Sequence, residues 1–237
     1  VTVSMSTLST GGFSIHNSGI AYYQSSFVEW VIIAFMILGG LNFTHYVYCL
    51  RGKIYRLFEP ELGVYLLSLI VFSVWTSFYL FGKNVTYLNG QVNTFGVAEA
   101  LRAGFFQLIS AQTSTGFSTV DYSLWMSVPQ VLMLGVMYLG GMAGSTSGGV
   151  KVIRYCLIFV ILKFKVESIF RPEAVRKVRL GKGLIDDRVQ TTVLGFFTIV
   201  MILSFIGTFI YIIDGVDPVT AMTVNTCMIN NIGLAFG

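Results

Sequence analysis

The chain has 237 residues, of which 54% are apolar and 11% are charged, and its mean hydropathy is +0.75. Because a soluble domain carries roughly 25% charged residues, this composition excludes an ordinary soluble protein and indicates a membrane protein. The net charge of +4 does not indicate nucleic-acid binding, because long apolar segments separate the basic residues and membrane topology explains them better. Cys49, Cys156 and Cys227 lie far apart in apolar runs, and they predict neither a disulfide framework nor a metal site.

The first residues predict the end of a short helix. Residues 1–8 lead into the loop Ser9-Thr10-Gly11-Gly12, and the chain ends four residues after Gly233 with no helix to follow. The sequence does not begin with Met, so we expect a fragment of a longer polypeptide.

Residues 27–50 predict the first transmembrane helix. The run is almost entirely apolar, and at about 1.5 Å per residue it is long enough to cross a hydrocarbon core of about 30 Å. We expect Gly39 and Gly40 to permit close helix packing rather than to form a hinge. His45, near the end of the run, is expected to be a polar residue with a satisfied partner rather than a proton-relay group.

A basic connection and a second span follow. Residues 51–61 are polar, and residues 62–81 are apolar over a length that crosses the membrane. Pro60 fits the first turn of this helix, where its missing N–H is not needed. Residues 82–96 are polar again and predict a loop on the opposite face.

Residues 97–111 predict a re-entrant helix. The segment is apolar with helical character but rises only about 22 Å, which is too short to cross. It leads into Ser114-Thr115-Gly116-Phe117, a near copy of Ser9-Thr10-Gly11-Gly12 displaced by 105 residues. Glu99 lies in the first turn and no basic residue follows Arg102 before the loop, so the helix directs the negative end of its dipole at the loop.

A glycine-rich break interrupts the next apolar region. Residues 129–139 and 150–162 are apolar, but neither spans the membrane alone at about 20 residues per crossing. Between them lie five glycines in ten residues, which predict a broken helix near mid-depth and a transport pathway; a glycine-lined helix contact is the alternative. The predicted gate comprises Gly140, Gly141, Gly144, Ser145, Thr146, Ser147, Gly148, Gly149 and Lys151. Lys151 either places a positive charge in the path of a cation or snorkels to the interface.

The last third of the chain repeats the re-entrant design. Residues 163–188 are strongly basic and predict a loop at the membrane face, with room for a short interfacial helix, and residues 189–213 predict a further crossing. Asp217 is a good N-cap and Pro218 a good first helical residue. The short helix that they begin leads to Asn231-Ile232-Gly233-Leu234, a third version of the loop.

The basic residues predict the orientation. Of fifteen Lys and Arg residues, only Lys83 and Arg102 lie outside residues 51–56 and 151–188. These two basic regions are therefore expected to be cytoplasmic, and the three glycine loops (residues 9–13, 113–117 and 230–234) are expected to enter from the outer face. Acidic residues on that face would attract cations.

The glycine loops predict an ion-selectivity filter. Non-helical backbone at membrane depth is tolerated only where it is buried in protein or lines a water-filled cavity. Carbonyl groups turned towards an axis replace the hydration shell of a cation, and glycine permits the backbone angles that this requires. Three versions of one loop indicate three sides of one site.

The chain resembles a known family over essentially its whole length. The sequences that carry the resemblance are Ser9-Thr10-Gly11-Gly12-Phe13, Thr113-Ser114-Thr115-Gly116-Phe117, Asn230-Asn231-Ile232-Gly233 and, above all, the run from Gly140 to Arg154. They are similar to the potassium-uptake membrane subunits of the Trk/Ktr/HKT superfamily of cation transporters. Residues 172–175 and 180–183 in the basic region resemble the Trk branch more than the Ktr branch.

The resemblance implies an all-α polytopic membrane protein. Its members have four repeats of helix, re-entrant pore helix, filter loop and helix around one central pore. By this comparison residues 1–50 are the end of the second repeat, residues 62–164 the third and residues 189–237 a truncated fourth, joined by cytoplasmic loops at 51–61 and 165–188. The first repeat and the last helix are missing. The implied filter residues are Thr10, Gly11, Gly12, Thr115, Gly116, Phe117, Ile232, Gly233 and Leu234, and the 140–149 loop is the implied gate.

The resemblance also implies the setting. We expect a multi-pass protein of the bacterial inner membrane, in contact with lipid, that forms a homodimer and binds a cytosolic nucleotide-binding regulatory subunit through its basic loops. K⁺ is the expected transported ion, with no organic cofactor and no nucleic-acid partner.

Two alternatives concern what is transported and how. Sodium transport or mixed transport by the same fold stays open, because the first filter loop is missing. A secondary transporter for an organic solute would also use broken helices, but it predicts an inverted repeat and a charged or aromatic midplane site.

An intramembrane enzyme is the third class of function. The sequence has no Gly-x-Ser-x-Gly elbow and no paired intramembrane carboxylates, and His16 and His45 have no evident nucleophile partner. We therefore expect no enzyme activity.

Overall fold

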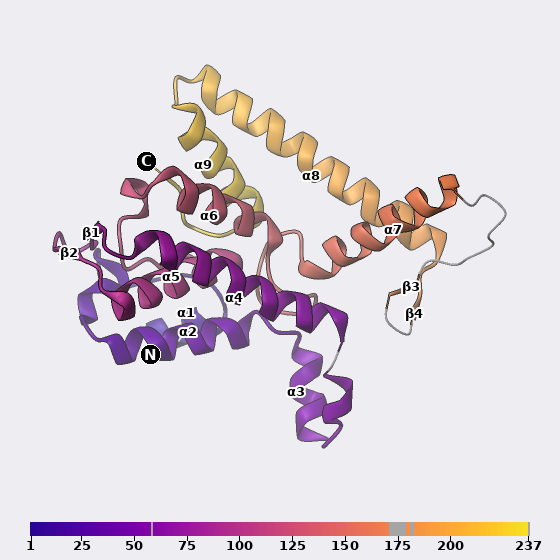
Figure 1. The fold of residues 1–237 in the computed structure, drawn as a ribbon, viewed down its shortest axis with the longest axis horizontal. Coiled ribbons are helices and arrows are strands. Elements are labelled where there is room, and N and C mark those ends of the chain that lie inside the picture. Colours follow the sequence, from indigo (N-terminus) through magenta and orange to yellow (C-terminus); the bar gives the residue numbers. More distant parts are fainter. Residues whose placement is uncertain (58, 171–178, 181–182, 237) are drawn as a thin grey trace.

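The computed structural model describes residues 1–57, 59–170, 179–180 and 183–236 (Figure 1). Helices dominate it, as the expected all-α membrane fold requires. The helices are α1 (Thr2–Leu8), α2 (Ser26–Gly39), α3 (Phe43–Leu50), α4 (Pro60–Leu80), α5 (Val97–Gln112), α6 (Ser127–Leu139), α7 (Val152–Phe170), α8 (Asp187–Ile213) and α9 (Pro218–Asn230). Short 3-10 turns cover Gly19–Tyr23, Ile54–Arg56 and Tyr122–Leu124.

Two small antiparallel hairpins lie in the connections between helices. Strands β1 (Asn84–Thr86) and β2 (Val92–Thr94) pair with Val85 opposite Asn93, and strands β3 (Arg179–Leu180) and β4 (Gly183–Leu184) form the second hairpin. Figure 1 shows the hairpins at opposite ends of the molecule. The first occupies the region that the sequence predicts to be an outer loop, and the second lies in the basic region.

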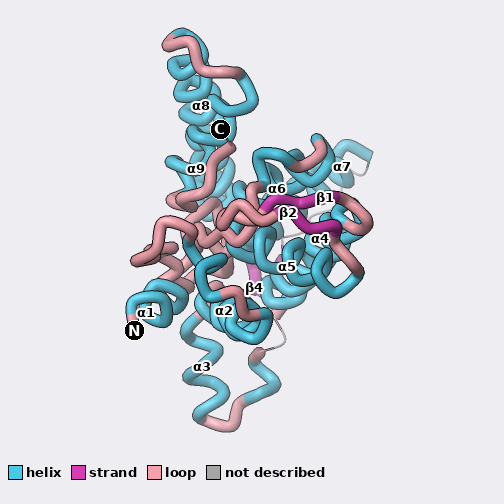
Figure 2. The backbone as a smooth tube through the Cα atoms, turned by 90° about the vertical axis from the view of Figure 1, so that its left-hand side faces the viewer, coloured by secondary structure: helices cyan, strands magenta, loops and turns pink. Residues whose placement is uncertain are grey.

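Each re-entrant helix packs against the long helix that precedes it. Helix α5 packs along α4, and α9 packs along α8. Helices α2 and α6 also contact α5, and α6 contacts α9, which joins the two units. Figure 2 shows the α8–α9 pair standing away from the part formed by α2, α4 and α5. The order of long helix, short helix and glycine loop therefore occurs twice.

Helix α5 lies in the centre of the structure. Its Ala100, Phe106, Leu108 and Ile109 side chains are all at most 1% exposed. At its start the Glu99 carboxylate accepts the Gly96 N–H at 2.7 Å, which satisfies one of the free donors of the first turn. The helix is too short to span a membrane, and its second half is buried in protein.

The first predicted transmembrane helix is bent, and the expectation of one straight helix over residues 27–50 is wrong. Helices α2 and α3 meet at 93° across the residues between Gly39 and Phe43. Close packing is also present, because a Cβ on Gly40 would lie 2.2 Å from the Tyr65 hydroxyl oxygen. The glycine pair therefore serves both as a close contact and as a break.

Helices α4 and α8 are each long and apolar enough to cross a membrane, and the bent α2–α3 pair is a third candidate if it counts as one span. Helix α6 is apolar but short, and the predicted break separates it from α7. Helix α7 continues to Phe170, so the expected loop at 165–188 begins as a helix. The family-like residues 172–175 and part of 180–183 lie outside the described residues.

A buried ion pair connects α5 to α2. Arg102 Nε lies 2.9 Å from the Glu29 carboxylate, and the two side chains are 17% and 8% exposed. Arg102 also donates to Ser26 and, at 3.3 Å, to the Tyr87 hydroxyl of the first hairpin. The guanidinium therefore holds the start of the re-entrant helix against two neighbouring elements.

Replacing Arg102 by methionine is expected to destabilise the protein by about 3 kcal/mol, because it leaves the Glu29 carboxylate buried without its partner. The melting temperature of the full-length protein in detergent should fall by several degrees. Lys83→Met removes an exposed cation from the same face and should leave the melting temperature unchanged. Equal melting temperatures for the two variants would show that the ion pair contributes little to stability.

Candidate functional site: three glycine loops above a broken helix

The helices that lead into the three glycine loops end in the same backbone motif. In each, a residue with a left-handed conformation ends the helix, and the next N–H bonds to the carbonyl five residues back, at 2.8, 2.9 and 3.0 Å. This is the Schellman motif, which satisfies free carbonyls at a helix end. The left-handed residues are Thr10 (φ 50°), Ser114 (φ 55°) and Asn231 (φ 52°). Two residues later comes a glycine with positive φ: Gly12 (70°), Gly116 (82°) and Gly233 (85°).

This repetition corrects the alignment of the first loop. The sequence pairs Ser9 with Ser114 because both begin a Ser-Thr-Gly tripeptide. The backbone instead pairs Thr10 with Ser114, and Gly12 with Gly116. The predicted alignment of the first loop with the second is therefore wrong by one residue: the positions equivalent to Thr115, Gly116 and Phe117 are residues 11–13.

The three loops lie side by side in sequence order. A Cβ on Gly12 would lie 2.1 Å from the Thr115 carbonyl oxygen, and one on Gly116 would lie 2.1 Å from the Ile232 carbonyl oxygen. The same glycine-to-carbonyl contact therefore occurs twice, and both positions exclude any side chain. Within the described part of the chain, the nearest atom to a Cβ on Gly233 is the Gly116 Cα, at 3.8 Å.

One side chain under each loop supports it from the preceding helix. Ser6 Oγ accepts the Phe13 N–H at 2.6 Å, and Ser110 Oγ donates to the Phe117 carbonyl at 2.7 Å. Cys227 Sγ, at the equivalent place, accepts the Gly233 N–H at 3.1 Å. The position of Cys227 in an apolar run predicts no disulfide and no metal site, and its spacing from Gly233 is the signal for this bond.

A buried tyrosine holds the end of the third loop region. The Tyr122 hydroxyl donates to the Ala235 carbonyl at 2.8 Å. Burial raises the pKa of Tyr122 to about 12, so the hydroxyl keeps its proton and remains a donor at neutral pH.

The 140–149 loop touches all three loop regions. Thr146 Oγ1 donates to the Leu8 carbonyl at the end of α1, at 3.1 Å. The Ser147 and Ser114 hydroxyl oxygens are 3.4 Å apart, and a Cβ on Gly148 would lie 2.2 Å from the Asn230 carbonyl oxygen. The structure therefore brings the predicted gate residues against residues that come just before each predicted filter segment.

The same loop is bonded to the bend between α2 and α3. The Met142 N–H donates to the Gly40 carbonyl and the Phe43 N–H donates to the Gly144 carbonyl, each at 3.0 Å. Thr146 Oγ1 is also 3.0 Å from the Gly39 carbonyl. The two broken helices that follow the first and second glycine loops thus satisfy each other's backbone at their breaks.

Lys151 turns back into the loop. The Lys151 backbone has a φ of 78°, and the Lys151 Nζ donates to the Ser147 carbonyl. Three residues later, Arg154 donates to the Val150 carbonyl at 2.7 Å and lies 4.1 Å from the centre of the Phe196 ring in α8. Both cations of the family-like run therefore bind carbonyls at the end of the loop.

His45 differs from its expectation. It is 4% exposed, and neither ring nitrogen has a hydrogen-bond partner among the described residues. The prediction of a satisfied polar residue is wrong, because the ring is buried without such a partner.

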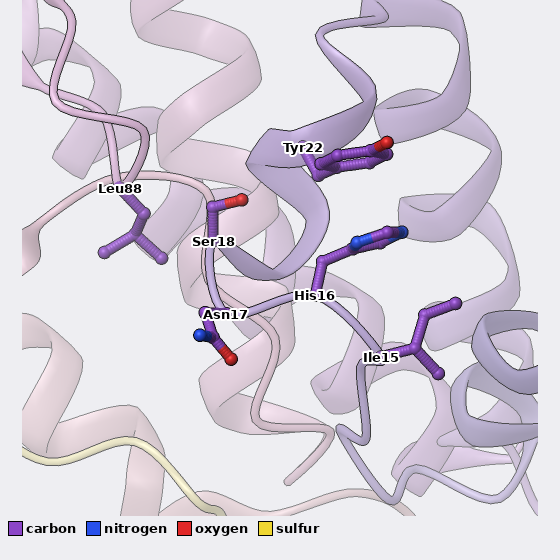
Figure 3. Close-up of a pocket in the computed structure, with 6 residues that line it drawn as sticks. All are labelled: Ile15, His16, Asn17, Ser18, Tyr22 and Leu88. Atoms are coloured by element: carbon purple, nitrogen blue, oxygen red, sulfur yellow. The ribbon is translucent and has the colours of Figure 1, made fainter.

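An open hollow of about 530 Å³ lies beyond the first glycine loop. Figure 3 shows the parallel rings of His16 and Tyr22 on one side of it, with their centres 3.6 Å apart. The remaining lining residues are Ile15, Asn17, Ser18 and Leu88. Among the described residues, no group of three His, Cys, Asp or Glu side chains could hold a metal ion.

Comparison with known proteins gives consistent matches. The model of the TrkH family, described as cation transport protein, matches residues 1–237. The chain is 33% identical over 236 residues to the Trk system potassium uptake protein TrkH of Halomonas elongata, and 32% identical over 237 residues to TrkG of Escherichia coli. These alignments cover 99% and 98% of this chain and 47% of each relative, so the chain spans about half their length.

A solved structure has the same fold. The crystal structure of the potassium transporter TrkH from Vibrio parahaemolyticus superposes with a TM-score of 0.84 at 26% identity. The match covers 98% of this chain and 49% of that chain.

Proposed function

Because this chain belongs to the TrkH family of cation transport proteins, we propose that it forms three sides of a potassium uptake pathway. The glycine loops would supply backbone carbonyls that replace the hydration shell of K⁺. By the backbone alignment, the carbonyl-bearing residues of the three loops are 11–13, 115–117 and 232–234.

The observation that carries this proposal is the repeated contact between neighbouring loops. Gly12 lies against the Thr115 carbonyl, and Gly116 lies in the same way against the Ile232 carbonyl. Successive sides of one ring require such a repeated contact. A fourth loop, between the third and the first, would close the ring. Relatives about twice as long, named as Trk system potassium uptake proteins, are consistent with that addition.

We propose that the 140–149 loop is the gate of this pathway. It contacts groups at or next to each glycine loop, so a cation leaving the filter would meet it next. These contacts with the glycine loops are made by hydroxyl and backbone groups, which exchange partners more readily than a packed core does.

The proposed setting is the bacterial inner membrane. The glycine loops would face the outside and the basic segments the cytoplasm, following the distribution of Lys and Arg. We also propose that the protein forms a homodimer. A cytosolic nucleotide-binding regulatory subunit would bind to the basic segments. Transport rather than catalysis agrees with the names of the relatives.

Rubidium-86 uptake tests the proposal. The full-length parent protein, reconstituted into liposomes with K⁺ inside, should accumulate the tracer, and external K⁺ should compete at lower concentration than Na⁺. Equal competition by Na⁺ would favour sodium or mixed transport by the same fold. Uptake that neither cation inhibits would exclude a cation pathway and favour a transporter for another solute.

A further inference from the structure

Glu61 has a buried carboxylate to which the proposed function assigns no role. It occupies the second position of α4 and is 4% exposed. A buried charge is costly unless it is hydrogen-bonded or paired. Glu59, two residues earlier, is exposed and provides a natural comparison.

The partners of Glu61 lie on both sides of the broken helix. Its Oε1 accepts the Ala143 N–H at 2.7 Å, inside the 140–149 loop. The backbone N–H of Ile153, in the first turn of α7, also interacts with the Glu61 carboxylate. One carboxylate therefore joins the entry of the loop to the helix that leaves it, although 82 residues separate Glu61 from Ala143.

These bonds satisfy donors that the break itself creates. The first N–H groups of any helix lack partners within the helix. In α7, the Val152 N–H donates to the Gly141 carbonyl at 3.0 Å, and the Ile153 N–H interacts with the Glu61 carboxylate. Hydrogen bonds to a charged acceptor are roughly twice as strong as neutral ones, so Glu61 stabilises this conformation of the loop more than a neutral side chain would.

Two basic side chains interact electrostatically with Glu61, namely Lys151 and His45. Lys151 Nζ donates to the Ser147 carbonyl, and His45 has no hydrogen-bond partner among the described residues. In the described part of the chain, Glu61 forms no ion pair within 4 Å. Glu61 therefore holds backbone amides of the broken helix rather than a fixed cationic side chain.

We propose that Glu61 is a positioning residue that latches the 140–149 loop in its closed position. This inference rests on the proposed gating role of that loop. Opening would require the Ala143 and Ile153 amides to separate or to leave the carboxylate together. Weakening the interactions between this carboxylate and the backbone amides should therefore favour opening of the loop without changing which cation passes.

Glu61→Gln in the full-length protein tests the latch. Glutamine keeps the size of the side chain but presents a single neutral oxygen, so it cannot hold both amides equally well. Rubidium-86 flux in liposomes without regulatory subunit should rise about tenfold, as for the loss of one charge-assisted bond. Glu59→Gln removes a neighbouring exposed charge that repels the Glu61 carboxylate, so it should not raise flux. The ratio of K⁺ to Na⁺ competition should be the same in all three proteins.

A deletion of residues 144–147 separates failure of the latch from failure of the gate. If the deletion raises flux and Glu61→Gln does not, Glu61 is not a latch while the loop remains a gate. If neither change raises flux, the gate and the latch are both overturned. If both raise flux, their combination should raise it by less than the product of the two separate increases, because Glu61 contacts the loop that the deletion shortens; a full product would assign Glu61 to another process.

Two further outcomes are decisive. Lower flux in Glu61→Gln at normal protein yield would overturn the latch, since it would mean that the carboxylate attracts the cation. Should the glutamine variant not fold, Glu61→Asp keeps the charge on a side chain one methylene shorter, and raised flux is again the expected result. Unchanged flux in a folded aspartate variant would also count against the latch.

Discussion

Replacing Gly116 by alanine is expected to lower rubidium-86 uptake by the full-length protein about 100-fold, equivalent to roughly 3 kcal/mol. The new Cβ would lie 2.1 Å from the Ile232 carbonyl oxygen, and the φ of 82° is unfavourable for any side chain. The second and third glycine loops would have to separate. A carbonyl that moves away from its place no longer replaces the water that the ion gives up.

Gly135→Ala is the matched control. Gly135 lies in the interior of α6, and a Cβ there would meet nothing within 4 Å. Alanine in a helix interior is favoured over glycine, so this variant should fold and transport normally. Gly12→Ala should reproduce the loss seen for Gly116→Ala, because its Cβ meets the equivalent carbonyl. Normal uptake by either loop variant would exclude these contacts from the pathway.

The sequence predicts most of the fold because each short helix carries its own boundaries. Asp217 accepts the Val219 and Thr220 N–H groups, and Pro218 takes the first helical position, as their side-chain chemistry predicts. The length of residues 97–111 excludes a span, and the glycines at 140–149 exclude a continuous helix. These are local signals, and the structure agrees with each of them.

The alignment of the first glycine loop with the second cannot be predicted from local sequence in the same way. Ser-Thr-Gly occurs at both Ser9 and Ser114, but the turn depends on which residues take a positive φ. Thr10 and Gly12 do so in the first loop. The shared Ser-Thr-Gly sequence therefore locates the first loop correctly. The alignment based on it, however, is displaced by one residue from the backbone equivalence.

The bend between α2 and α3 depends on contacts distant in sequence. Gly39 and Gly40 are compatible with a straight helix, and nothing nearby requires 93°. The groups that satisfy the broken backbone lie about a hundred residues later, at Met142, Gly144 and Thr146. Glu61 was missed for the same reason: its partners in the broken helix become visible only in the folded chain.

Deleting residues 144–147 is expected to raise rubidium-86 flux through the full-length protein at least about tenfold, a shift of roughly 1.4 kcal/mol in favour of the open state. The deletion removes the bonds from Thr146 to the Leu8 and Gly39 carbonyls and the contact between Ser147 and Ser114. Because the glycine loops keep their Schellman motifs and their contacts with one another, the order of K⁺ and Na⁺ competition should not change.

A single substitution tests the same equilibrium with less disturbance. Thr146→Val keeps the shape of the side chain and removes the hydroxyl donor, so flux should rise in the same direction but less than in the deletion. Thr198→Val is its control, because the Thr198 hydroxyl bonds only to the Leu194 carbonyl of its own helix. Raised flux with altered cation preference would mean that the 140–149 loop contributes to selectivity. Unchanged flux in a folded deletion variant would mean that a cation does not pass this loop, and the pathway would then have to leave the filter by another route.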